Sequence, residues 1–407
     1  MGITGPGGVG KTFLMGYMID KIMPAYFDTC KMMGIQPEYE NVHMTATTNK
    51  AAEVLSQATG RQCQTIHSFL GLKVTEDYRT GKQSLTKTRS WSVKQNIILF
   101  VDEASMIDRQ LYRYIHEGTL NCKIIYVGDH CQLAPVMETL SPVFRNDITF
   151  YELTQPMRTQ NPHLQALNLQ LRQTVETGIF KPIKIVPGTI DLLDDSQMEE
   201  MIEQYFFQQN PNSRILAYTN ARVIEYNEHI RELRQLPDEF TVGEELVNNA
   251  AFQMPGYMLS VEEEIEILSI DDAIQEAFID HYDGEDIKLK YRTAIVKNTL
   301  GYEFKNVKLP IDRKYHLELV KFFARLKNWP VYYMLTKEFP DFRQRDAGTV
   351  YKAQGSTLDP VFIDMANISG CKNPDQAARM LYVALSRARN RIFMYGELAQ
   401  KYGGLIL

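Results

Sequence analysis

Cysteine is scarce in this sequence and shows no pattern. The 407 residues include five cysteines, all separate and never in a CxxC pair: Cys30, Cys63, Cys122, Cys131 and Cys371. An odd number of scattered cysteines argues against a disulfide framework and against a cysteine-based zinc site. Such usage is typical of a reducing cytoplasm, where we expect the protein to act.

Long apolar runs are also missing. No stretch approaches the roughly 20 apolar residues of a membrane-spanning helix. The first residues lack the basic region and apolar core of a secretory leader. We therefore expect no membrane association. A hydrophobic content of 44% is ordinary for a globular protein, and the length allows two to four domains.

Positive charge is in the minority. The sequence has 44 Lys and Arg against 50 Asp and Glu, a formal charge of −6. This balance excludes a protein that coats nucleic acid through bulk charge, although a narrow basic groove stays possible. Basic residues gather in 73–94, whereas acidic clusters occupy 191–203, 262–272 and 280–286. We interpret the acidic clusters as solvated surface.

The most informative feature present is the segment GPGGVGKT at residues 5–12, a complete P-loop. Residues 1–4 suit a strand before it and residues 13–23 a helix after it. Backbone N–H groups of such a loop, together with the helix N-terminus, hold phosphate oxygens. Lys11 would reach the β- and γ-phosphates, and Thr12 would hold Mg²⁺. The candidate nucleotide-binding residues are Gly5, Pro6, Gly7, Gly8, Val9, Gly10, Lys11, Thr12 and Phe13.

Two continuous apolar runs, 97–101 and 123–127, predict parallel strands that are covered on both faces. The first run ends in Asp102 and Glu103, as expected of a Walker B strand. Asp102 would bind Mg²⁺, and Glu103 would polarise the attacking water as general base. Gln132 follows the second run, and its amide can donate to phosphate and accept from water. It therefore suits a nucleotide sensor, although an ordinary polar loop is the alternative.

The rest of the sequence predicts an α/β fold with two insertions. Further strands are expected at 42–46, 214–218, 361–365 and 391–395, and further helices at 49–58, 221–235 and 374–386. Residues 73–78 and 82–88 alternate around a turn at 79–81, which predicts a β-hairpin. Residues 243–345 mix short strands (264–269, 288–296) with an amphipathic helix (313–326), which predicts a separate subdomain.

Arginines in two later segments could reach a phosphate. Arg387 and Arg389 end the apolar segment LYVALSRAR, and Arg158 lies in LTQPMRTQ. The apolar segment could be a surface helix. Alternatively, Arg387 or Arg158 could act as an arginine finger that reaches the γ-phosphate from a second domain.

In order, these motifs resemble those of superfamily 1 DNA helicases, most closely the phage Dda-like and RecD-like branch. Each later motif is weak alone, but many of them in the right order are specific. Besides the P-loop, the matching segments are TATTNKAAEVL (45–55), TIHSFL (65–70), VDEAS (101–105), GDHCQLAPV (128–136), LTQPMRTQNP (153–162), AYTNARVIEYNEHIR (217–231), AGTVYKAQGSTLD (347–359) and LYVALSRARNRI (381–392).

The resemblance implies two RecA-like domains with ATP and Mg²⁺ in the cleft between them. The first would be residues 1–152 with the hairpin at about 73–92. The second would be 153–242 and 346–407, with 243–345 as an inserted small barrel and helical projection. The nucleotide would be contacted from the first domain by Lys11, Thr12, Asp102, Glu103 and Gln132. It would be contacted from the second domain by Arg158, Gly355 and Arg387.

The resemblance also implies a track of single-stranded DNA across both domains, with the hairpin as the pin that splits a fork. The implied DNA contacts are Thr47, His67, Asn220, Thr349, Lys352 and Gln354. For His67 and Asn220, capping or core hydrogen bonds are the alternative. The branch moves 5′ to 3′ and would act as a monomer, alongside single-strand-binding, replication and recombination proteins.

Other functions stay open. The chain could be a translocase or protein-displacing ATPase that does not unwind efficiently, or a P-loop ATPase that acts without nucleic acid. RNA is a lesser alternative as the track, since no RNA-specific module is visible. Family members read adenine with a glutamine on a helix before the P-loop strand. Here only four residues precede Gly5, which leaves the preference for ATP over GTP open.

Overall fold

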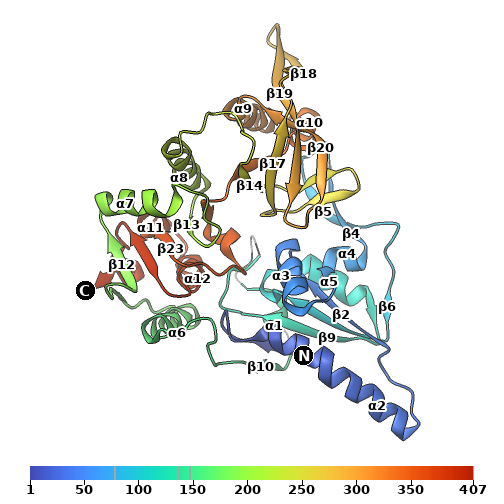
Figure 1. The fold of residues 1–407 in the computed structure, drawn as a ribbon. Helices are drawn as coiled ribbons and strands as arrows, with labels where there is room; N and C mark the ends of the chain where they lie inside the picture. The colour runs from blue at the N-terminus through green and yellow to red at the C-terminus, as the bar shows by residue number, and fades with distance from the viewer. Residues whose placement is uncertain (78, 136–137, 139, 146–147, 407) are drawn as a thin grey trace.

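Two parallel sheets organise the chain (Figure 1). The structure is a computed structural model that describes residues 1–77, 79–135, 138, 140–145 and 148–406. The first sheet has the order β10-β1-β9-β7-β2-β3, and all its strand pairs are parallel. Its strands are β1 (Gly2–Thr4), β2 (Asn41–Ala46), β3 (Gln64–Thr65), β7 (Ile97–Asp102), β9 (Lys123–Gly128) and β10 (Phe150–Glu152).

The second sheet is also parallel, in the order β12-β24-β23-β13-β22. Its strands are β12 (Ile190–Leu193), β13 (Arg214–Ala217), β22 (Ala347–Thr349), β23 (Val361–Asp364) and β24 (Ile392–Tyr395). The central strand β23 is buried along its whole length, as the continuous apolar runs of a covered parallel sheet require. The predicted α/β class is confirmed.

Helices pack around the first sheet. They are α1 (Lys11–Tyr17), a π-helical turn (Met18–Ile22), α2 (Met23–Met33), α3 (Asn49–Thr59), α4 (Ile66–Leu70) and α5 (Arg109–Glu117). The helix predicted to end at residue 23 continues through α2. The π-helical turn ends two residues before Pro24, whose missing N–H cannot join the α-helical ladder. Gly34, with φ 66°, ends α2.

The second sheet carries α6 (Pro162–Thr177), α7 (Asp195–Phe206), α8 (Asn220–Leu233), α11 (Met365–Ser369) and α12 (Pro374–Leu385). Every residue of α12 from Ala377 to Leu385 is buried. A helix that is apolar on all sides belongs in a protein interior. The alternative of a surface helix is therefore wrong for this segment, and the arginine that follows it is held inside the protein.

The two predicted insertions are present. A hairpin of β4 (Leu72–Glu76) and β5 (Gln83–Lys87) leaves the first sheet; Tyr78, at the end of its predicted first strand, lies outside the described residues. A short parallel pair, β6 (Lys94–Gln95) and β8 (Thr119–Leu120), follows it. In the part of the chain that forms the second sheet, β11 (Ile183–Lys184) pairs in parallel with β25 (Leu405–Ile406).

The larger insertion is an antiparallel sheet in the order β18-β19-β17-β14-β21, with β20 beside β19. Its strands are β14 (Glu245–Asn248), β17 (Glu264–Ile270), β18 (Gln275–Tyr282), β19 (Glu285–Asn298), β20 (Glu303–Pro310) and β21 (Phe342–Gln344), and a small ladder joins β15 (Phe252–Met254) to β16 (Tyr257–Leu259). Two helices pack on it, α9 (Arg313–Arg325) and α10 (Trp329–Glu338). Figure 1 shows β18 and β19 projecting as a ribbon at the top. The sequence analysis missed α10, which Asn328 caps.

The hairpin turn packs against α10 of the larger insertion. A methyl group added to Gly81 would lie 2.4 Å from Cε2 of Trp329. The hydroxyl of Tyr333 donates to the carbonyl oxygen of Gly81 at 3.3 Å. Lys337 forms an ion pair with Glu76 on the hairpin. The hairpin is therefore held at its tip as well as at its base.

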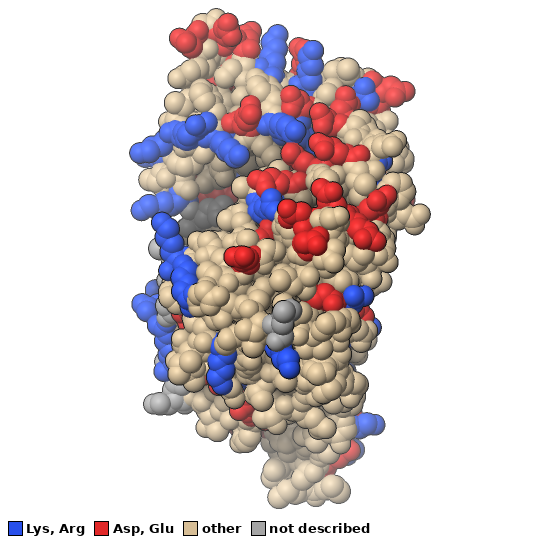
Figure 2. Space-filling model, turned by 90° about the vertical axis from the view of Figure 1, so that its left-hand side faces the viewer, with Lys and Arg blue, Asp and Glu red and all other residues tan. Residues whose placement is uncertain are grey.

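Charge is segregated over the surface. On the face drawn in Figure 2, acidic side chains gather over the middle, while lysines and arginines line one edge beside a hollow. Within the part of the chain that the structure describes, no helix combines the length and apolar character needed to cross a lipid bilayer.

Candidate active site

The P-loop connects β1 to α1. The ammonium of Lys11 donates to the carbonyl oxygens of Gly5 at 2.7 Å and Pro6 at 2.8 Å. Gly8 has φ +80°, and a methyl group there would lie 2.3 Å from Cβ of Arg158. Only glycine adopts that backbone conformation at such close approach without strain. The backbone N–H of Met157 also donates to the carbonyl oxygen of Gly8, so the segment that carries Arg158 lies directly on the loop.

The two predicted carboxylates stand at the end of β7. Glu103 adopts a left-handed backbone conformation, φ 53°, which is uncommon for residues other than glycine. Its N–H donates to Oδ1 of Asp102 at 2.9 Å. Burial, followed by the charge of Glu103, raises the pKa of Asp102 to about 7. Burial lowers the pKa of Lys11, while the carboxylates of Asp129, Glu103 and Asp102 act in the opposite direction.

Two arginines from later segments of the chain lie against the P-loop. A methyl group on Gly7 would lie 2.9 Å from Nη1 of Arg158 and 3.4 Å from Nη2 of Arg387. Arg158 donates to the carbonyl oxygen of Ser386 at 2.8 Å. Arg387, 1% exposed, donates to the carbonyl oxygen of Val383 at 2.9 Å and to the hydroxyl of Ser386 at 3.1 Å.

These two guanidiniums form a positive site with neutral partners. Burial, and then the charge of Arg387, lowers the pKa of Arg158 to about 9, and burial also lowers that of Arg387. Among the described residues, neither forms an ion pair with a carboxylate within 4.0 Å. Buried charges are normally paired, and guanidiniums bind carboxylate or phosphate oxygens well. The arrangement can therefore accept an anion beside the P-loop.

The loop after β9 is bonded to α12 and α6. Asp129, fully buried, accepts a hydrogen bond from the hydroxyl of Tyr382 at 2.6 Å and from Nη1 of Arg172 at 2.8 Å. Arg379 donates to the carbonyl oxygen of Gln132 at 2.8 Å. Sequence reasoning missed Arg172, Arg379 and Tyr382. For Arg379 and Tyr382 the available signal was the presence of polar side chains, three residues apart on one face, in the mostly apolar helix α12. Arg172 gave no such signal, because α6 carries many other polar residues.

Two buried amide oxygens near the P-loop and β7 have no hydrogen-bond partner within the described part of the chain. Gln132 is 4% exposed, and its Oε1 has no hydrogen-bond partner among the described residues. Oε1 of Gln354 is likewise buried and without a hydrogen-bond partner among the described residues. Through Nε2, Gln354 donates to Oε2 of Glu103 at 3.3 Å and to Oγ of Ser105 at 3.1 Å. The side chain expected on the DNA track is thus found at the carboxylate expected to act as general base.

The remaining predicted DNA residues divide into two groups. Thr47 is buried at the end of β2 and donates to the carbonyl oxygen of Glu103 at 3.2 Å. Burial lowers the pKa of His67, which lies in α4. Asn220, Thr349 and Lys352 line one small cavity together. They meet at the second sheet, where Asn220 is exposed and Thr349 is buried.

Lys352 is already paired in this cavity. Its ammonium lies 2.8 Å from Oε1 of Glu262 and also contacts Oδ1 of Asn249. Glu262 in turn forms an ion pair with Nη1 of Arg214 at 2.7 Å. A DNA phosphate at Lys352 would have to replace the Glu262 carboxylate.

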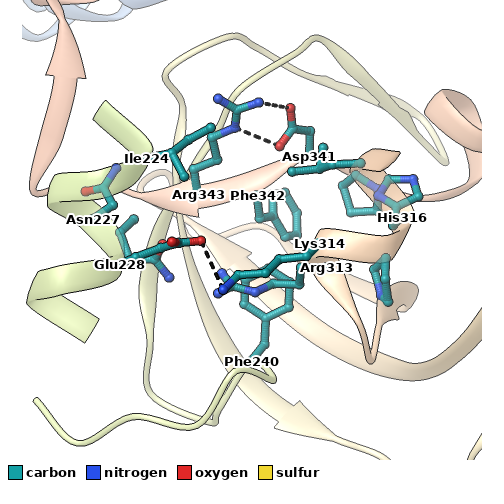
Figure 3. Close-up of a pocket in the computed structure, with 14 residues that line it drawn as sticks. Ile224, Asn227, Glu228, Phe240, Arg313, Lys314, His316, Asp341, Phe342 and Arg343 are labelled. Carbon is teal, nitrogen blue, oxygen red and sulfur yellow. Dashed lines mark hydrogen bonds and ion pairs between the residues drawn. The ribbon is translucent and has the colours of Figure 1, made fainter. Parts of the chain in front are cut away.

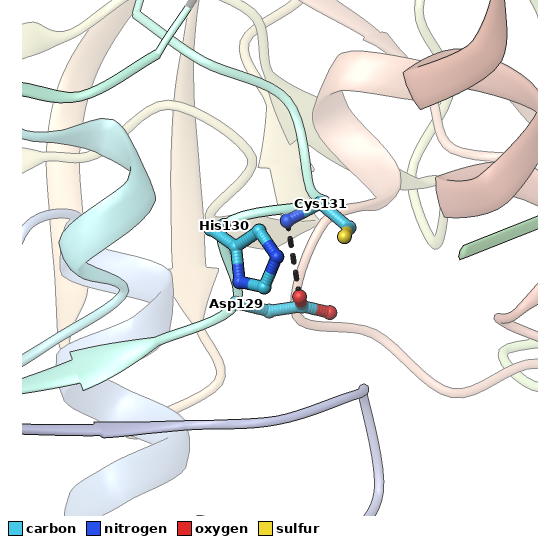
Figure 4. Close-up of side chains that lie close together, drawn as sticks. All are labelled: Asp129, His130 and Cys131. Carbon is cyan, nitrogen blue, oxygen red and sulfur yellow. Dashed lines mark hydrogen bonds between the residues drawn. The ribbon is translucent and has the colours of Figure 1, made fainter. Parts of the chain in front are cut away.

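Two other clusters carry no assigned ligand. Ligand atoms of Asp129, His130 and Cys131 lie within 4.8 Å of one another (Figure 4). The Asp129 carboxylate there is engaged by hydrogen bonds, including one from the backbone N–H of Cys131 at 3.1 Å. We assign no metal ion to this cluster.

Figure 3 shows a pocket between α8 and the larger insertion. Glu228 lies 3.5 Å from Lys314, and Asp341 lies 2.8 Å from Arg343. Arg313 also lines the pocket and donates through Nε to the carbonyl oxygen of Asp238 at 2.9 Å. We assign no ligand to this pocket.

Known families match both units of the chain. Residues 1–181 match the AAA domain family, and residues 346–395 match the UvrD-like helicase C-terminal domain. The chain is 25% identical to the ATP-dependent DNA helicase dda of Enterobacteria phage T4 over 435 residues. That match covers 96% of this chain and 93% of that protein.

Solved Pif1 helicase structures share the fold. One is Pif1 from Bacteroides in complex with ADP-AlF3 and ssDNA, with TM-score 0.50. Another, described as the structural basis for DNA unwinding at forked dsDNA by two coordinating Pif1 helicases, has TM-score 0.51. Both are 16% identical and cover 100% of this chain and 90% of their own. The expected fold of two RecA-like domains is therefore confirmed.

Proposed function

We infer that this chain, a superfamily 1 helicase of the Dda-like type with the fold of Pif1 helicase, hydrolyses ATP between its two RecA-like domains to move along single-stranded DNA and separate strands. One observation carries the proposal: Arg158 and Arg387, from beyond the first sheet, lie against Gly7 of the P-loop. Phosphates held by that loop would meet both guanidiniums. The domain division at residues 152, 242 and 345 belongs to this proposal, and it is supported by the separate sheet in each part.

The P-loop and β7 would hold the nucleotide and its metal ion. Lys11 would leave its carbonyl partners for the β- and γ-phosphates, and Thr12 and Asp102 would hold Mg²⁺. The chemistry of these donors fits a divalent cation, because Asp102 and Glu103 are adjacent carboxylates whose repulsion a cation would offset. When bound, Mg²⁺ would neutralise charge that develops on the phosphate oxygens. Phe13, 78% exposed beside the loop, offers an apolar face to the nucleotide.

Hydrolysis would depend on closure of the cleft. Glu103 would accept the proton of the attacking water, and the amide N–H of Gln132 would donate to the γ-phosphate as a nucleotide sensor. Arg158 and Arg387 would compensate the charge of the transferred phosphoryl group from the other domain. The contacts of Arg379 and Tyr382 with the loop after β9 join the two domains beside this site. ATP turnover and relative domain movement would thereby be linked.

The DNA strand would run across both domains. His67 on the first domain and Asn220, Thr349 and Lys352 on the second would contact it, and we propose movement from 5′ to 3′. Such contacts are mainly with phosphates, so they need only a local group of donors and not a basic protein overall. The hairpin would divide the duplex ahead of the strand, since its docking on α10 keeps it rigid.

Shortening the hairpin is expected to separate translocation from unwinding. Replacing residues 75–84 with Asn-Gly keeps the Val74–Leu85 pair and closes it with a favoured two-residue turn. Without a wedge that offsets about one base-pair step of stacking (~1.4 kcal/mol), the unwinding rate should fall about tenfold. The hairpin supplies no group to the nucleotide site, so DNA-stimulated ATP hydrolysis should stay near that of the wild type.

The measurement is displacement of a fluorescent strand from duplexes with a 5′ or a 3′ single-stranded tail, alongside ATP turnover. Trp329→Ala is the matched variant, because it loosens the hairpin tip without shortening the hairpin. Unchanged unwinding by the shortened protein would remove the hairpin from strand separation. Preferential opening of the 3′-tailed duplex by the wild type would reverse the proposed direction.

A further inference from the structure

We propose that Gln354 is a positioning residue for ATP hydrolysis, supplied by the second RecA-like domain to hold Glu103 and the attacking water. This inference rests on the proposed hydrolysis between the two domains. It replaces the expectation that Gln354 contacts DNA.

The side chain of Gln354 lies beside the carboxylate of Glu103. Gln354 follows the 3-10 turn Val350–Ala353 after β22 and reaches across the cleft. Its Nε2 donates to Oε2 of Glu103 at 3.3 Å and to Oγ of Ser105 at 3.1 Å. The next residue, Gly355, has φ +85°, and a methyl group there would lie 3.7 Å from Oε1 of Glu103. Side chain and backbone of the second domain therefore both border the general base.

Gln354 also offers a free acceptor at this position. Oε1 of Gln354 is shielded from solvent and has no hydrogen-bond partner among the described residues. Leaving a buried acceptor unpaired is unfavourable, so a donor should occupy this position when the site is filled. A water between Glu103 and Gln354 can donate one hydrogen to each.

Two donated hydrogen bonds would orient the water for attack. Its oxygen would bond to the γ-phosphorus, its proton would pass to Glu103, and the bond from phosphorus to the bridging oxygen of ADP would break. Gln354 exchanges no proton in this step. Its contribution is geometric, because a nucleophile held in line reacts much faster than one that is free to rotate.

The turn that carries Gln354 also faces the proposed DNA side. Two residues earlier, Lys352 contacts Glu262 and Asn249 of the larger insertion. Only Ala353 separates Lys352, which contacts the larger insertion, from Gln354, which contacts Glu103. A DNA phosphate that drew Lys352 away from Glu262 would pull on this short turn. It would therefore also shift Gln354. This connection gives a physical path by which DNA could stimulate hydrolysis.

The test compares Gln354→Ala and the isosteric Gln354→Glu with wild type in the full chain. Because one misdirected contact at the reacting atoms can cost about 100-fold, kcat should fall by about 10- to 100-fold in both variants. KM for ATP and the affinity for fluorescent single-stranded DNA should change less than about twofold, because in this proposal Gln354 contacts neither the bound nucleotide nor the DNA. Gln170→Ala is the control, because that glutamine lies on α6 and donates to the carbonyl oxygen of Pro182 at 3.0 Å, within the second domain.

A double variant tests whether Gln354 acts through Glu103. Gln354→Ala in a Glu103→Gln background should cause little further loss, because both residues act on the same water. Full additivity of the two losses would overturn the inference. So would weak DNA binding by Gln354→Ala with normal kcat at saturating DNA, which would return the residue to the DNA track. If the wild type hydrolysed no ATP, the proposed function itself would fail; if Glu103→Gln stopped hydrolysis but Gln354→Ala and Gln354→Glu did not, only this inference would.

Discussion

Alanine in place of Arg387 is expected to lower the DNA-stimulated rate of ATP hydrolysis by about a thousandfold or more, the contribution of an arginine finger. The guanidinium of Arg387 lies beside Gly7 of the P-loop, yet it is carried by the end of α12 on the other side of the cleft. Removing it leaves the phosphate-binding loop intact. ATP should therefore still bind, as measured with a fluorescent analogue, while steady-state turnover at saturating single-stranded DNA collapses.

Arg389→Ala is the matched control for this variant. Arg389 lies two residues further along and is exposed, so its replacement should leave turnover near that of the wild type. Because Arg387 is 1% exposed, a thermal melt must show that Arg387→Ala is folded at the assay temperature. Turnover above a tenth of the wild-type value in a folded Arg387→Ala, with loss of turnover in Arg158→Ala, would transfer the role to Arg158.

Glutamine in place of Glu103 should stop turnover while preserving the nucleotide complex. The substitution keeps the size of the side chain and removes its ability to take a proton, which is worth about 10²- to 10⁴-fold in rate. Lys11 and the backbone of the P-loop are unchanged, so the affinity for ATP should remain within a few-fold of the wild type. Single-turnover hydrolysis and equilibrium binding, measured on one preparation, separate the two quantities.

Glu225→Gln is the comparison for Glu103. Glu225 lies on α8 in a solvent-exposed ion pair with Arg222, and such pairs contribute little. That variant should turn over ATP at the wild-type rate. A Glu103→Gln protein that kept its rate would show that another group accepts the proton, and the interpretation of β7 as a Walker B strand would have to be abandoned.

Local sequence signals predicted four strands of the first sheet, β1, β2, β7 and β9, and placed the P-loop and the Asp102–Glu103 pair at the ends of two of them. The glycines and lysine of the P-loop, and the carboxylates that end β7, follow from short-range chemistry and from the continuous apolar strands of a covered sheet. These features depend on neighbours in sequence, so they can be read without knowing the fold. The start of α3 at Thr48 and its end at Gly60 are of the same kind, because capping is also local.

Contacts between the two domains could not be predicted in the same way. Asp129 is bonded to Tyr382 across 253 positions, and Gln354 to Glu103 across 251. Nothing in the spacing of these residues indicates which of them meet. The burial of α12 was likewise undetermined, since an apolar helix can pack inside a protein or against a partner. In the larger insertion, α10 was missed because aromatic and β-branched residues at its start are weak helix formers.

A structure of the protein with ADP, aluminium fluoride, Mg²⁺ and single-stranded DNA would show whether both domains contact the nucleotide. We expect the fluoride in contact with Lys11 on one side and with the guanidiniums of Arg158 and Arg387 on the other. This expectation would be contradicted by a bound nucleotide that touches only the first domain, with Arg158 and Arg387 still directed at Ser386 and Val383.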